Sequence, residues 1–231
     1  MQVIQNTPEK IILRIDANES LANALRRSIS EISVLAIDEV EIFKNDSALY
    51  DEVLALRLGL IPLKTEKSMS SKTKIELKLS KKGPCTVYAE DLQGKAEITE
   101  PKIPITILGE NHKLELVATA TLGTGLTHAK YIPGLCFYRH VLEVKSSPQI
   151  DKMIQDSKGL IKPEKKGTKW ICDLNDALID EIKNIDSNAI SDSNELIFVI
   201  ESYGNMSAKD ILEKAVAVLE SNLTEFEKNV K

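Results

Sequence analysis

The segment from Ser20 to Leu63 constrains the fold most, because it carries more apolar surface than its own elements can bury. Its first part predicts a helix from Ser20 to about Ile32, with apolar side chains at the i, i+3, i+4 and i+7 spacing of one helix face. Arg26 and Arg27 fall on the other side. The apolar face consists of Leu21, Ala24, Leu25, Ser28, Ile29 and Ile32. A face of this length must pack against another element.

A second helix is predicted from Asp51 to Gly59, and Pro62 prevents its continuation. This helix has almost no polar face, because its apolar residues point in nearly all directions. They are Val53, Leu54, Leu56, Leu58 and, just after the helix, Leu60. A helix that is apolar all round is buried on several sides. In a chain of 231 residues, we expect part of this cover to come from another polypeptide.

Charge and composition argue against several classes of protein. The net charge is -5 and the isoelectric point is about 5.4, whereas broad binding to nucleic-acid phosphates needs a basic face. Aromatic residues make up only 4% of the chain, which weakens a role in stacking on bases or sugars. No apolar run reaches the roughly 18 residues of a membrane-spanning helix and no secretory leader is recognised, so we expect no membrane partner and a cytoplasmic location. The scattered Cys85, Cys136 and Cys172 are typical of buried thiols in a reducing compartment.

Each end of the chain predicts one strand followed by one amphipathic helix. Residues 10–15 alternate as a strand before the first helix, and residues 195–201 form a second, buried strand. A long helix follows Gly204-Asn205, with Ser207 as its N-cap. Its apolar stripe consists of Ile211, Leu212, Ala215, Val218, Leu219, Leu223 and Phe226. This stripe is either part of the core or the seam of a dimer.

Short strands dominate the middle of the chain, and the pattern weakens from residue 146 to residue 194. The predicted strands are residues 74–79, 86–89, 103–108, 114–121 and 137–145. We therefore predict an α+β fold in which a terminal strand–helix domain carries an inserted, mainly β domain. The terminal domain is discontinuous (residues 1–37 and 191–231), the insert spans residues 38–146, and residues 147–190 form a small subdomain.

No motif for catalysis or metal binding is found. The three histidines lack a cysteine or carboxylate at the spacing of metal ligands. Gly123-Thr124-Gly125 lacks the following Lys of a phosphate-binding loop and is interpreted as a turn. Asp51 and Glu52 open a helix, where the backbone dipole favours negative charge. We expect no catalytic residue in the chain.

Two alternatives stay open at this point. A stand-alone soluble enzyme or ligand-binding α+β protein would place its site in the β insert, around His128 and Asp91. A nucleic-acid-binding module would use the lysines between Lys158 and Lys169, against the acidic balance of the whole chain.

Three motifs stand in order along the chain. They are Leu21–Arg27 (LANALRR), Ala36–Val40 (AIDEV) with Asp51–Leu63 (DEVLALRLGLIPL), and His128–Pro133 (HAKYIP). In this combination they resemble the NALRR, DExLAHRLGLIPL and EHAKWSP stretches of the alpha-type assembly subunits of multisubunit RNA polymerases. The archaeal D-type members, homologous to the third-largest subunit of eukaryotic polymerase II, are the most similar. Leu56 stands where that family usually has His, a departure that touches no catalytic group.

The resemblance implies a scaffold role in transcription by DNA-dependent RNA polymerase. The terminal domain would be a dimerisation domain that pairs with a smaller paralogous subunit, the archaeal L-type subunit. The heterodimer would nucleate the two largest, catalytic subunits and would meet small zinc-bearing subunits. DNA would be reached only through the complex, and the nucleotidyltransferase chemistry would belong to the large subunits.

The resemblance also implies which residues meet partners. On the two terminal helices they are Leu21, Leu25, Arg26, Arg27, Leu212, Val218, Leu219 and Phe226. In the insert they are Asp51, Glu52, Arg57, Leu60, Pro62, His128 and Lys130. We expect Arg26, Arg27 and the Asp51–Leu63 segment to face the second-largest subunit, and the His128–Pro133 loop to face the small zinc-bearing subunits or a large subunit.

No cofactor is expected in this chain. Some archaeal members of the family hold an iron–sulfur cluster in a region that corresponds to residues 147–190. Here that region has only Cys172, whereas a cluster needs about four thiolates. Magnesium and zinc are expected in the partner subunits.

Overall fold

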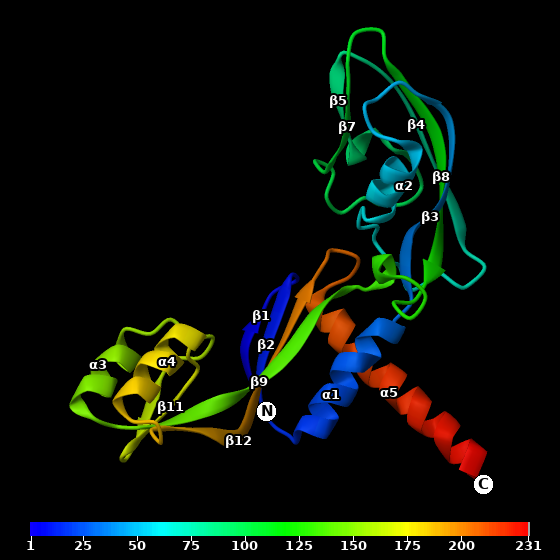
Figure 1. The fold of residues 1–231 in the computed structure, drawn as a ribbon. Helices are drawn as coiled ribbons and strands as arrows, with labels where there is room; N and C mark the ends of the chain where they lie inside the picture. The colour runs from blue at the N-terminus through cyan, green and yellow to red at the C-terminus, as the bar shows by residue number, and fades with distance from the viewer. Residues whose placement is uncertain (231) are drawn as a thin grey trace.

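The computed structural model describes residues 1–230 and has three parts. Figure 1 shows a central sheet with two helices against it, a lobe of small sheets around one helix, and a subdomain at the opposite end of the central sheet. The N-terminus lies in the central part, and the final helix runs away from it toward the C-terminus. The chain is therefore α+β, and its first strands and its last strand and helix belong to the same central part.

The central sheet has six antiparallel strands in the order β1, β2, β12, β9, β11 and β10. Their bounds are β1 (Gln2–Asn6), β2 (Lys10–Asp16), β9 (Gly134–Lys145), β10 (Glu164–Lys166), β11 (Lys169–Cys172) and β12 (Ile190–Ser202). Strand side chains alternate between the two faces of a sheet. In β12, Leu196, Phe198 and Ile200 belong to one core cluster, whereas Ile197 and Val199 belong to the cluster on the other face.

Two helices cover one face of the central sheet, namely α1 (Glu19–Ser28) and α5 (Ala208–Val230). Asn18 caps α1, because its Oδ1 accepts a hydrogen bond from the Leu21 amide at 2.9 Å. Ala22, Ile211 and Ala215 are buried against the sheet. The helix predicted to reach Ile32 ends instead at Ser28 and is followed by a 3-10 turn, Ile29–Glu31.

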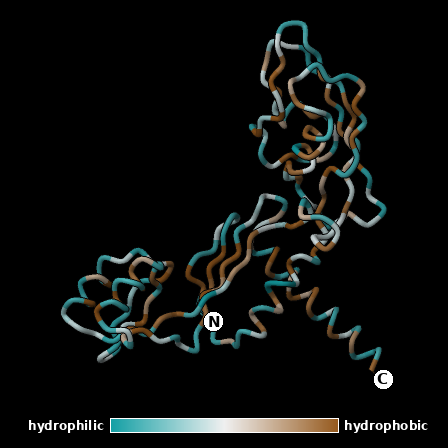
Figure 2. Tube along the Cα trace, in the orientation of Figure 1, coloured by the Kyte–Doolittle hydropathy of each residue, from teal (hydrophilic) through white to brown (hydrophobic). Residues whose placement is uncertain are grey.

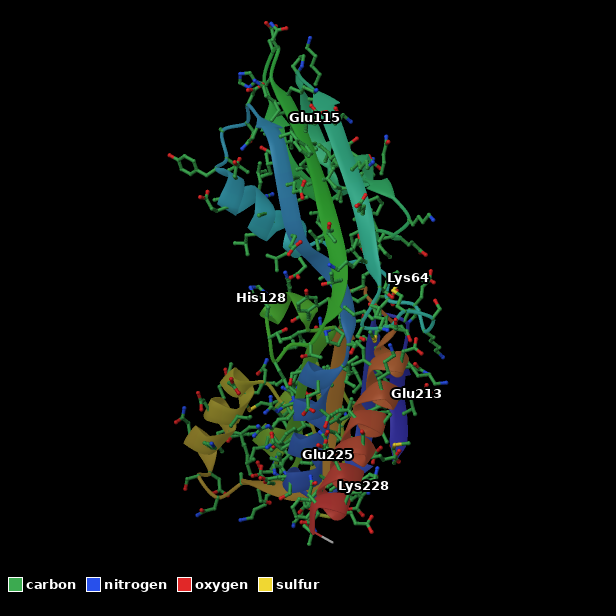
Figure 3. The ribbon with its side chains drawn as sticks, turned by 90° about the vertical axis from the view of Figure 1, so that its right-hand side faces the viewer. Lys64, Glu115, His128, Glu213, Glu225 and Lys228 are labelled. Atoms are coloured by element: carbon green, nitrogen blue, oxygen red, sulfur yellow. The ribbon has the colours of Figure 1, made fainter. Side chains whose placement is uncertain are left out.

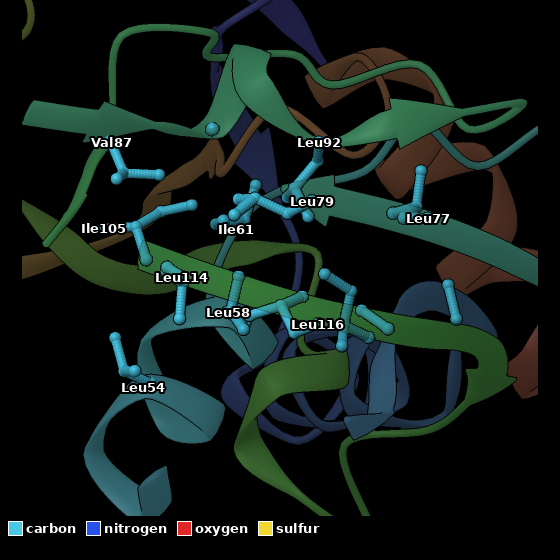
Figure 4. Close-up of a cluster of buried hydrophobic side chains, with 14 of the residues drawn as sticks. Leu54, Leu58, Ile61, Leu77, Leu79, Val87, Leu92, Ile105, Leu114 and Leu116 are labelled. Atoms are coloured by element: carbon cyan, nitrogen blue, oxygen red, sulfur yellow. The ribbon is translucent and has the colours of Figure 1, made fainter. Parts of the chain in front are cut away.

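The lobe is built from two small sheets and one helix. Its elements are β3 (Val34–Asn45), α2 (Asp51–Gly59), β4 (Lys74–Lys82), β5 (Cys85–Tyr88), β6 (Gln93–Gly94), β7 (Pro104–Leu108) and β8 (Lys113–Gly123). The four-stranded sheet has the order β3, β8, β4, β6, and β5 pairs with β7. Leu54 and Leu58 of α2 are buried in the same cluster as Ile105 and Leu116 (Figure 4).

The apolar pattern of α2 predicts burial on several sides, but the structure buries one side only. Leu54 and Leu58 are fully buried, whereas Leu56 is 56% exposed and Leu60 is 58% exposed. The sheets of the lobe touch one face of this short helix, and nothing else in the described chain covers the opposite face. The exposed face is therefore available to another molecule.

One predicted strand belongs to a different part of the molecule. The alternation of residues 137–145 predicts a strand of the insert, but β9 hydrogen-bonds to β12 and β11 in the central sheet. The period-2 pattern shows that a segment is a strand and carries no information about its pairing partner, which is distant in sequence. The five residues of β1, which pair with β2, were also not predicted as a strand.

The weak pattern of residues 146–194 conceals a folded subdomain. It contains α3 (Pro148–Gln155), α4 (Asp176–Ile185) and the β10–β11 hairpin. Its own core consists of Val144, Ile150, Ile154, Trp170, Cys172, Leu174, Ile182 and Ala189. Short elements separated by polar turns give each helix and strand too few residues for a periodic signal.

Candidate interaction surfaces

Helix α5 is anchored at its start and exposed at its end. Ser207 caps it: the Asp210 amide donates to Ser207 Oγ at 3.1 Å, and Ser207 Oγ donates to Asp210 Oδ2 at 2.6 Å. Ala208, Ile211 and Ala215 are buried. From Glu220 to Val230 every residue is exposed. The second half of α5 therefore projects from the body, as Figure 1 shows.

The projecting half continues an apolar row, which we call the α5 seam. It consists of Leu212, Val216, Leu219, Leu223, Phe226 and Val230. Successive members are four and three residues apart in alternation, the spacing at which one helix packs against another helix. Leu223 is 60% exposed, Phe226 is 68% exposed and Val230 is 69% exposed. Figure 2 shows hydrophobic residues recurring along α5 to its end.

Helix α1 lies against α5 and presents both apolar and basic side chains. Leu21 is 48% exposed, although its spacing predicts the apolar face, and Leu25 is half-buried. Arg26 is exposed, and within residues 1–230 it donates only to Asn23 on its own helix, at 2.9 Å and 3.2 Å. Arg27 is exposed and makes no side-chain hydrogen bond or ion pair within residues 1–230. Its charge is free to meet a partner.

The exposed side of α2 forms a second apolar surface, the α2 face, made of Tyr50, Val53, Leu56 and Leu60. Tyr50 is 80% exposed and Val53 is 40% exposed. Polar groups beside this face are held locally: Arg57 Nη2 donates to the Pro104 carbonyl at 2.6 Å, and Asn45 Nδ2 donates to Asp51 Oδ1 at 2.8 Å. Glu52 is exposed.

The His128–Pro133 loop divides into an exposed tip and an internally bonded base. His128 is exposed, and its Nδ1 accepts from the Lys130 amide at 3.1 Å. Lys130 Nζ lies 2.7 Å from Asp38 Oδ1, and the Tyr131 hydroxyl donates to the same oxygen at 3.0 Å. The hydrogen bond from Lys130 lowers the pKa of Asp38. Lys130 therefore uses its charge within the lobe. Figure 3 shows His128 at the end of the lobe nearest the central part.

The lobe and the central part are joined by hydrogen bonds around the turn before α5. Asn205 is buried, and its Nδ2 donates to the Leu63 carbonyl at 3.1 Å. The Thr65 amide donates to the Asn205 carbonyl at 2.9 Å. Pro62 is half-buried beside this junction and close to Gly204. These bonds hold the α2 face in a defined orientation relative to the α5 seam.

The structure gives little support to the two alternative functions, an enzyme site around His128 and Asp91 and a nucleic-acid-binding surface on the lysines between Lys158 and Lys169. His128 and Asp91 are not joined by any hydrogen bond, and Asp91 forms an ion pair with Lys81. Within residues 1–230, no group of three or more His, Cys, Asp or Glu side chains is arranged to hold a metal ion. Of the lysines between 158 and 169, Lys169 is paired with Glu143 at 2.7 Å, and Lys165 is paired in the subdomain.

Asp151 is the centre of a polar network in the subdomain. Its carboxylate accepts from Trp170 Nε1 at 2.7 Å and from Ser146 Oγ at 2.8 Å, and it lies 2.7 Å from Lys165 Nζ. Lys165 also lies over the Trp170 ring, 5.4 Å from its centroid. The hydrogen bonds from Lys165 and then Trp170 lower the pKa of Asp151 to about 2. Charged Asp151 therefore stabilises the folded subdomain.

Replacing Asp151 by asparagine is expected to lower the urea midpoint of the subdomain at pH 7. Because the folded pKa is depressed, the stabilisation is present above pH ~4, the ordinary pKa of an aspartate, and is lost as the pH falls toward 2. The gap between wild type and Asp151→Asn should therefore shrink below pH ~4. The chain has a single tryptophan, Trp170, so its fluorescence reports this subdomain directly.

The control for this experiment is Asp180→Asn, since Asp180 is an exposed α4 carboxylate that makes no hydrogen bond or ion pair in the described chain. We expect its midpoint to equal that of wild type. Equal midpoints for Asp151→Asn and Asp180→Asn at pH 7 would contradict a stabilising role for the network.

The surfaces combine sequence predictions with residues that the sequence patterns did not indicate. Leu21, Leu223 and Phe226 of the predicted stripes are exposed, and so is Leu60. Val216, Val230 and Tyr50 were not predicted as interface residues. For the two valines a signal existed, because they continue the alternating spacing of four and three residues along α5.

Comparisons with known proteins agree with this architecture. Residues 36–134 match the RNA polymerase Rpb3/RpoA insert domain, which corresponds to the lobe. The DNA-directed RNA polymerase subunit Rpo3 of Methanocaldococcus jannaschii is 30% identical over 94% of this chain and 88% of its own length. The Rpo3 subunit of Pyrococcus horikoshii is 31% identical over 95% and 93%, and that of Halobacterium salinarum is 32% identical over 92% and 89%.

None of the helices within residues 1–230 combines the length and apolar character needed to cross a membrane. The relatives match almost the whole of the chain, and the insert-domain match falls on the lobe that carries the α2 face. The chain belongs to the family of DNA-directed RNA polymerase subunits Rpo3.

Proposed function

We propose that this chain is a non-catalytic assembly platform of a DNA-directed RNA polymerase. In this proposal the central part, as a dimerisation domain, pairs with a small paralogous subunit, corresponding to the archaeal L-type subunit. The lobe then recruits the two largest subunits and the small zinc-bearing subunits. The chain acts in the cytoplasm and meets DNA only through the complex.

The exposed α5 seam is the observation that carries this proposal. Leu223, Phe226 and Val230 are exposed. They belong to the half of α5 that extends beyond the body, where no other element of the described chain covers them. Burial of apolar surface stabilises by about 25 cal/mol per Å2 before association costs are subtracted. Obligate interfaces often exceed about 2,000 Å2, more than one helix face supplies, so α1 with Leu21 and Leu25 would contribute to the same contact.

The experiment that tests the proposal is reconstitution with the small paralogous subunit of the same organism. Light scattering on a sizing column should show one copy of each chain in a single peak. The chain expressed alone should be poorly soluble, and coexpression should rescue it. A soluble monomer that does not bind the small subunit would overturn the proposal.

The α2 face and the arginines of α1 are proposed to meet the second-largest subunit. The α2 face presents Tyr50, Val53, Leu56 and Leu60 to solvent. Arg26 and Arg27 are exposed, and arginine is enriched among the residues that dominate interface energies. The exposed His128 tip is proposed to meet the small zinc-bearing subunits or a large subunit.

Reversing both charges with Arg26→Glu and Arg27→Glu is expected to block assembly while the isolated fold stays intact. Both side chains are exposed, and neither bonds beyond α1, so circular dichroism and the melting temperature should not change. Capture of the second-largest subunit by the heterodimer should fall by about tenfold or more. The charge-matched control is Lys158→Glu with Lys162→Glu, on exposed lysines of the subdomain. Equal capture by the two double variants would contradict this role.

The chemistry of nucleotide addition is proposed to lie wholly in partner subunits. Magnesium and zinc would be bound there, and this chain would hold no catalytic residue and no iron–sulfur cluster. Cys172 is buried, and burial raises the pKa of its thiol to about 12, which disfavours the thiolate that a metal requires.

A further inference from the structure

The two edges of the central sheet differ in length and in charge. At one edge, β10 has only three residues, and all three are charged. At the other edge, β1 has five residues, and none of them is charged. Figure 1 shows β1 beside β2 at the border of this sheet. Proteins commonly protect an edge strand from pairing with another chain by making it short and placing lysines on it. The edge at β10 has this protection, whereas the edge at β1 does not.

The β1 edge has exposed side chains and open backbone groups. Four of its five residues are exposed, and Val3 is 53% exposed. The Thr7 amide donates to the Lys10 carbonyl at 2.9 Å, and the adjacent residue Asn6 is paired with Ile11. Hydrogen-bonded and non-hydrogen-bonded positions alternate in an antiparallel pair, so the N–H and C=O of Asn6 point away from β2. No other element within residues 1–230 bonds to them.

A β-bulge interrupts β1 without detaching it from the sheet. The register shifts between Val3 and Gln5, and Ile4 packs against the buried cluster that contains Ile12. Bulges can blunt an edge, but here pairing with β2 continues through Gln5 and Asn6 after the shift. The bulge therefore anchors β1 to the core, and the outer side of the strand stays open.

A groove of about 550 Å3 lies beside β1, lined by residues of β1 and of the segment 157–164. Two of its lining residues, Ile4 and Leu160, pack against the cluster on the sheet face opposite α1 and α5. Successive side chains of a strand point to opposite faces of its sheet. A strand added to β1 would therefore direct every second side chain toward this groove.

The groove offers an incoming segment little open charge. Arg14 lines it but is only 8% exposed, and its Nη2 lies 2.6 Å from Glu195 Oε2 and its Nη1 3.6 Å from Glu164 Oε2. Lys162 also lines the groove and is exposed, so its long side chain can keep its charge in water. Burying a charge without a partner is costly, so the segment that fits this edge is mostly uncharged.

We propose that β1 receives an extended, mostly uncharged strand from a further subunit of the polymerase, other than the small paralogous one. The backbone of that strand would bond to the open groups of β1, and its alternate side chains would enter the groove. The groove lies on the sheet face that α1 and α5 do not cover, so a subunit seated on the α5 seam does not occupy it. The inference rests on the proposed function, because the assembled polymerase supplies the strand.

The first test measures amide hydrogen exchange in residues 1–8 of the wild-type chain. It compares the heterodimer with the small subunit and the complete reconstituted polymerase. Exchange in this peptide should slow by about tenfold or more in the complete polymerase, because added backbone hydrogen bonds protect amides. Slow exchange in the heterodimer already, or in the chain alone at high concentration, would assign the strand to the small subunit or to a second copy. Either result would overturn the inference.

Two substitutions of Asn6 test the backbone bond itself. Asn6→Pro removes the outward N–H and Asn6→Ala keeps it, and proline is tolerated on an edge strand where the N–H faces solvent. Circular dichroism and the melting temperature of the isolated chain should stay unchanged in both variants. In competition with wild type during reconstitution, Asn6→Pro should enter the polymerase about two- to tenfold less often, the effect of one hydrogen bond. Asn6→Ala should enter as often as wild type, and equal incorporation of the two variants would contradict the inference.

The outcomes separate the two proposals. If the wild-type chain binds no small subunit and enters no polymerase, the proposed function fails, and this inference fails with it. If the wild type assembles but residues 1–8 exchange equally fast in the heterodimer and in the polymerase, only the inference about β1 is overturned. The exchange measurement uses the wild-type chain, so it decides the question even if Asn6→Pro does not fold.

Discussion

Replacing Leu223 and Phe226 together by alanine is expected to weaken binding of the small subunit by several hundredfold. Both side chains lie in the projecting half of α5, at 60% and 68% exposure. If the contact buries them, truncating each large apolar side chain costs about 2 kcal/mol or more, and about 4 kcal/mol for the two is several hundredfold in the dissociation constant. Titration calorimetry or a fluorescence binding assay with the purified small subunit measures the change.

The fold of the isolated chain should survive this double substitution. Neither side chain belongs to a buried cluster, so no cavity is created, and alanine favours the helix at least as well as Leu and Phe do. The matched control is Phe43→Ala with Ile107→Ala, since these residues are 64% and 72% exposed on the lobe. Binding of the small subunit should be unchanged in the control. Equal weakening in the two double variants would mean that the α5 seam is not the contact.

Replacing Leu58 by alanine is expected to destabilise the lobe by about 2–5 kcal/mol. Leu58 is fully buried in α2, in the cluster with Ile61, Leu79 and Leu116 (Figure 4). Truncating a buried leucine loses its transfer free energy and leaves a cavity that the surroundings fill only in part. Urea unfolding monitored by circular dichroism should show a clear drop in the midpoint, and the loss is a large share of a typical domain's stability.

The matched control for this experiment is the variant Leu56→Ala, because Leu56 lies two residues away on the same helix. Leu56 is 56% exposed, so its truncation should change the free energy of unfolding by no more than about 0.5 kcal/mol. The same substitution should reduce capture of the second-largest subunit if the α2 face meets it. A strong loss of stability in Leu56→Ala would show that α2 is covered within the chain and would remove the α2 face as a docking surface.

Several elements follow from local patterns alone. The start of α5 follows from Ser207, the N-cap that the sequence predicts for this helix. The strand at Leu196–Ile200 follows from a short, uninterrupted apolar run. The resemblance to the family rests on contiguous motifs such as Asp51–Leu63. These features depend on neighbours close along the chain, so one sequence is enough to reveal them.

Long-range relations were not accessible in the same way. The alternating pattern of β9 predicts a strand of the insert, but β9 pairs with β12. This pairing joins residues that are far apart in the chain, such as His140 and Leu196, and a local pattern cannot indicate it. The junction through Asn205 and Leu63 joins residues that are distant in sequence and carries no periodic signal. The fold of residues 147–190 depends on Asp151, Trp170 and Lys165 meeting in space.

The apolar patterns along the chain are enough to show that it has more apolar helix surface than a small core can use, and where that surface lies. They do not show which half of each helix face is covered, and this follows from the three-dimensional arrangement alone. It buries Leu54 and Leu58 but leaves Leu56 and Leu60 in solvent, and it buries Ile211 but exposes Phe226. The difference arises because periodicity defines a face of one helix, whereas burial depends on what the rest of the chain places against that face.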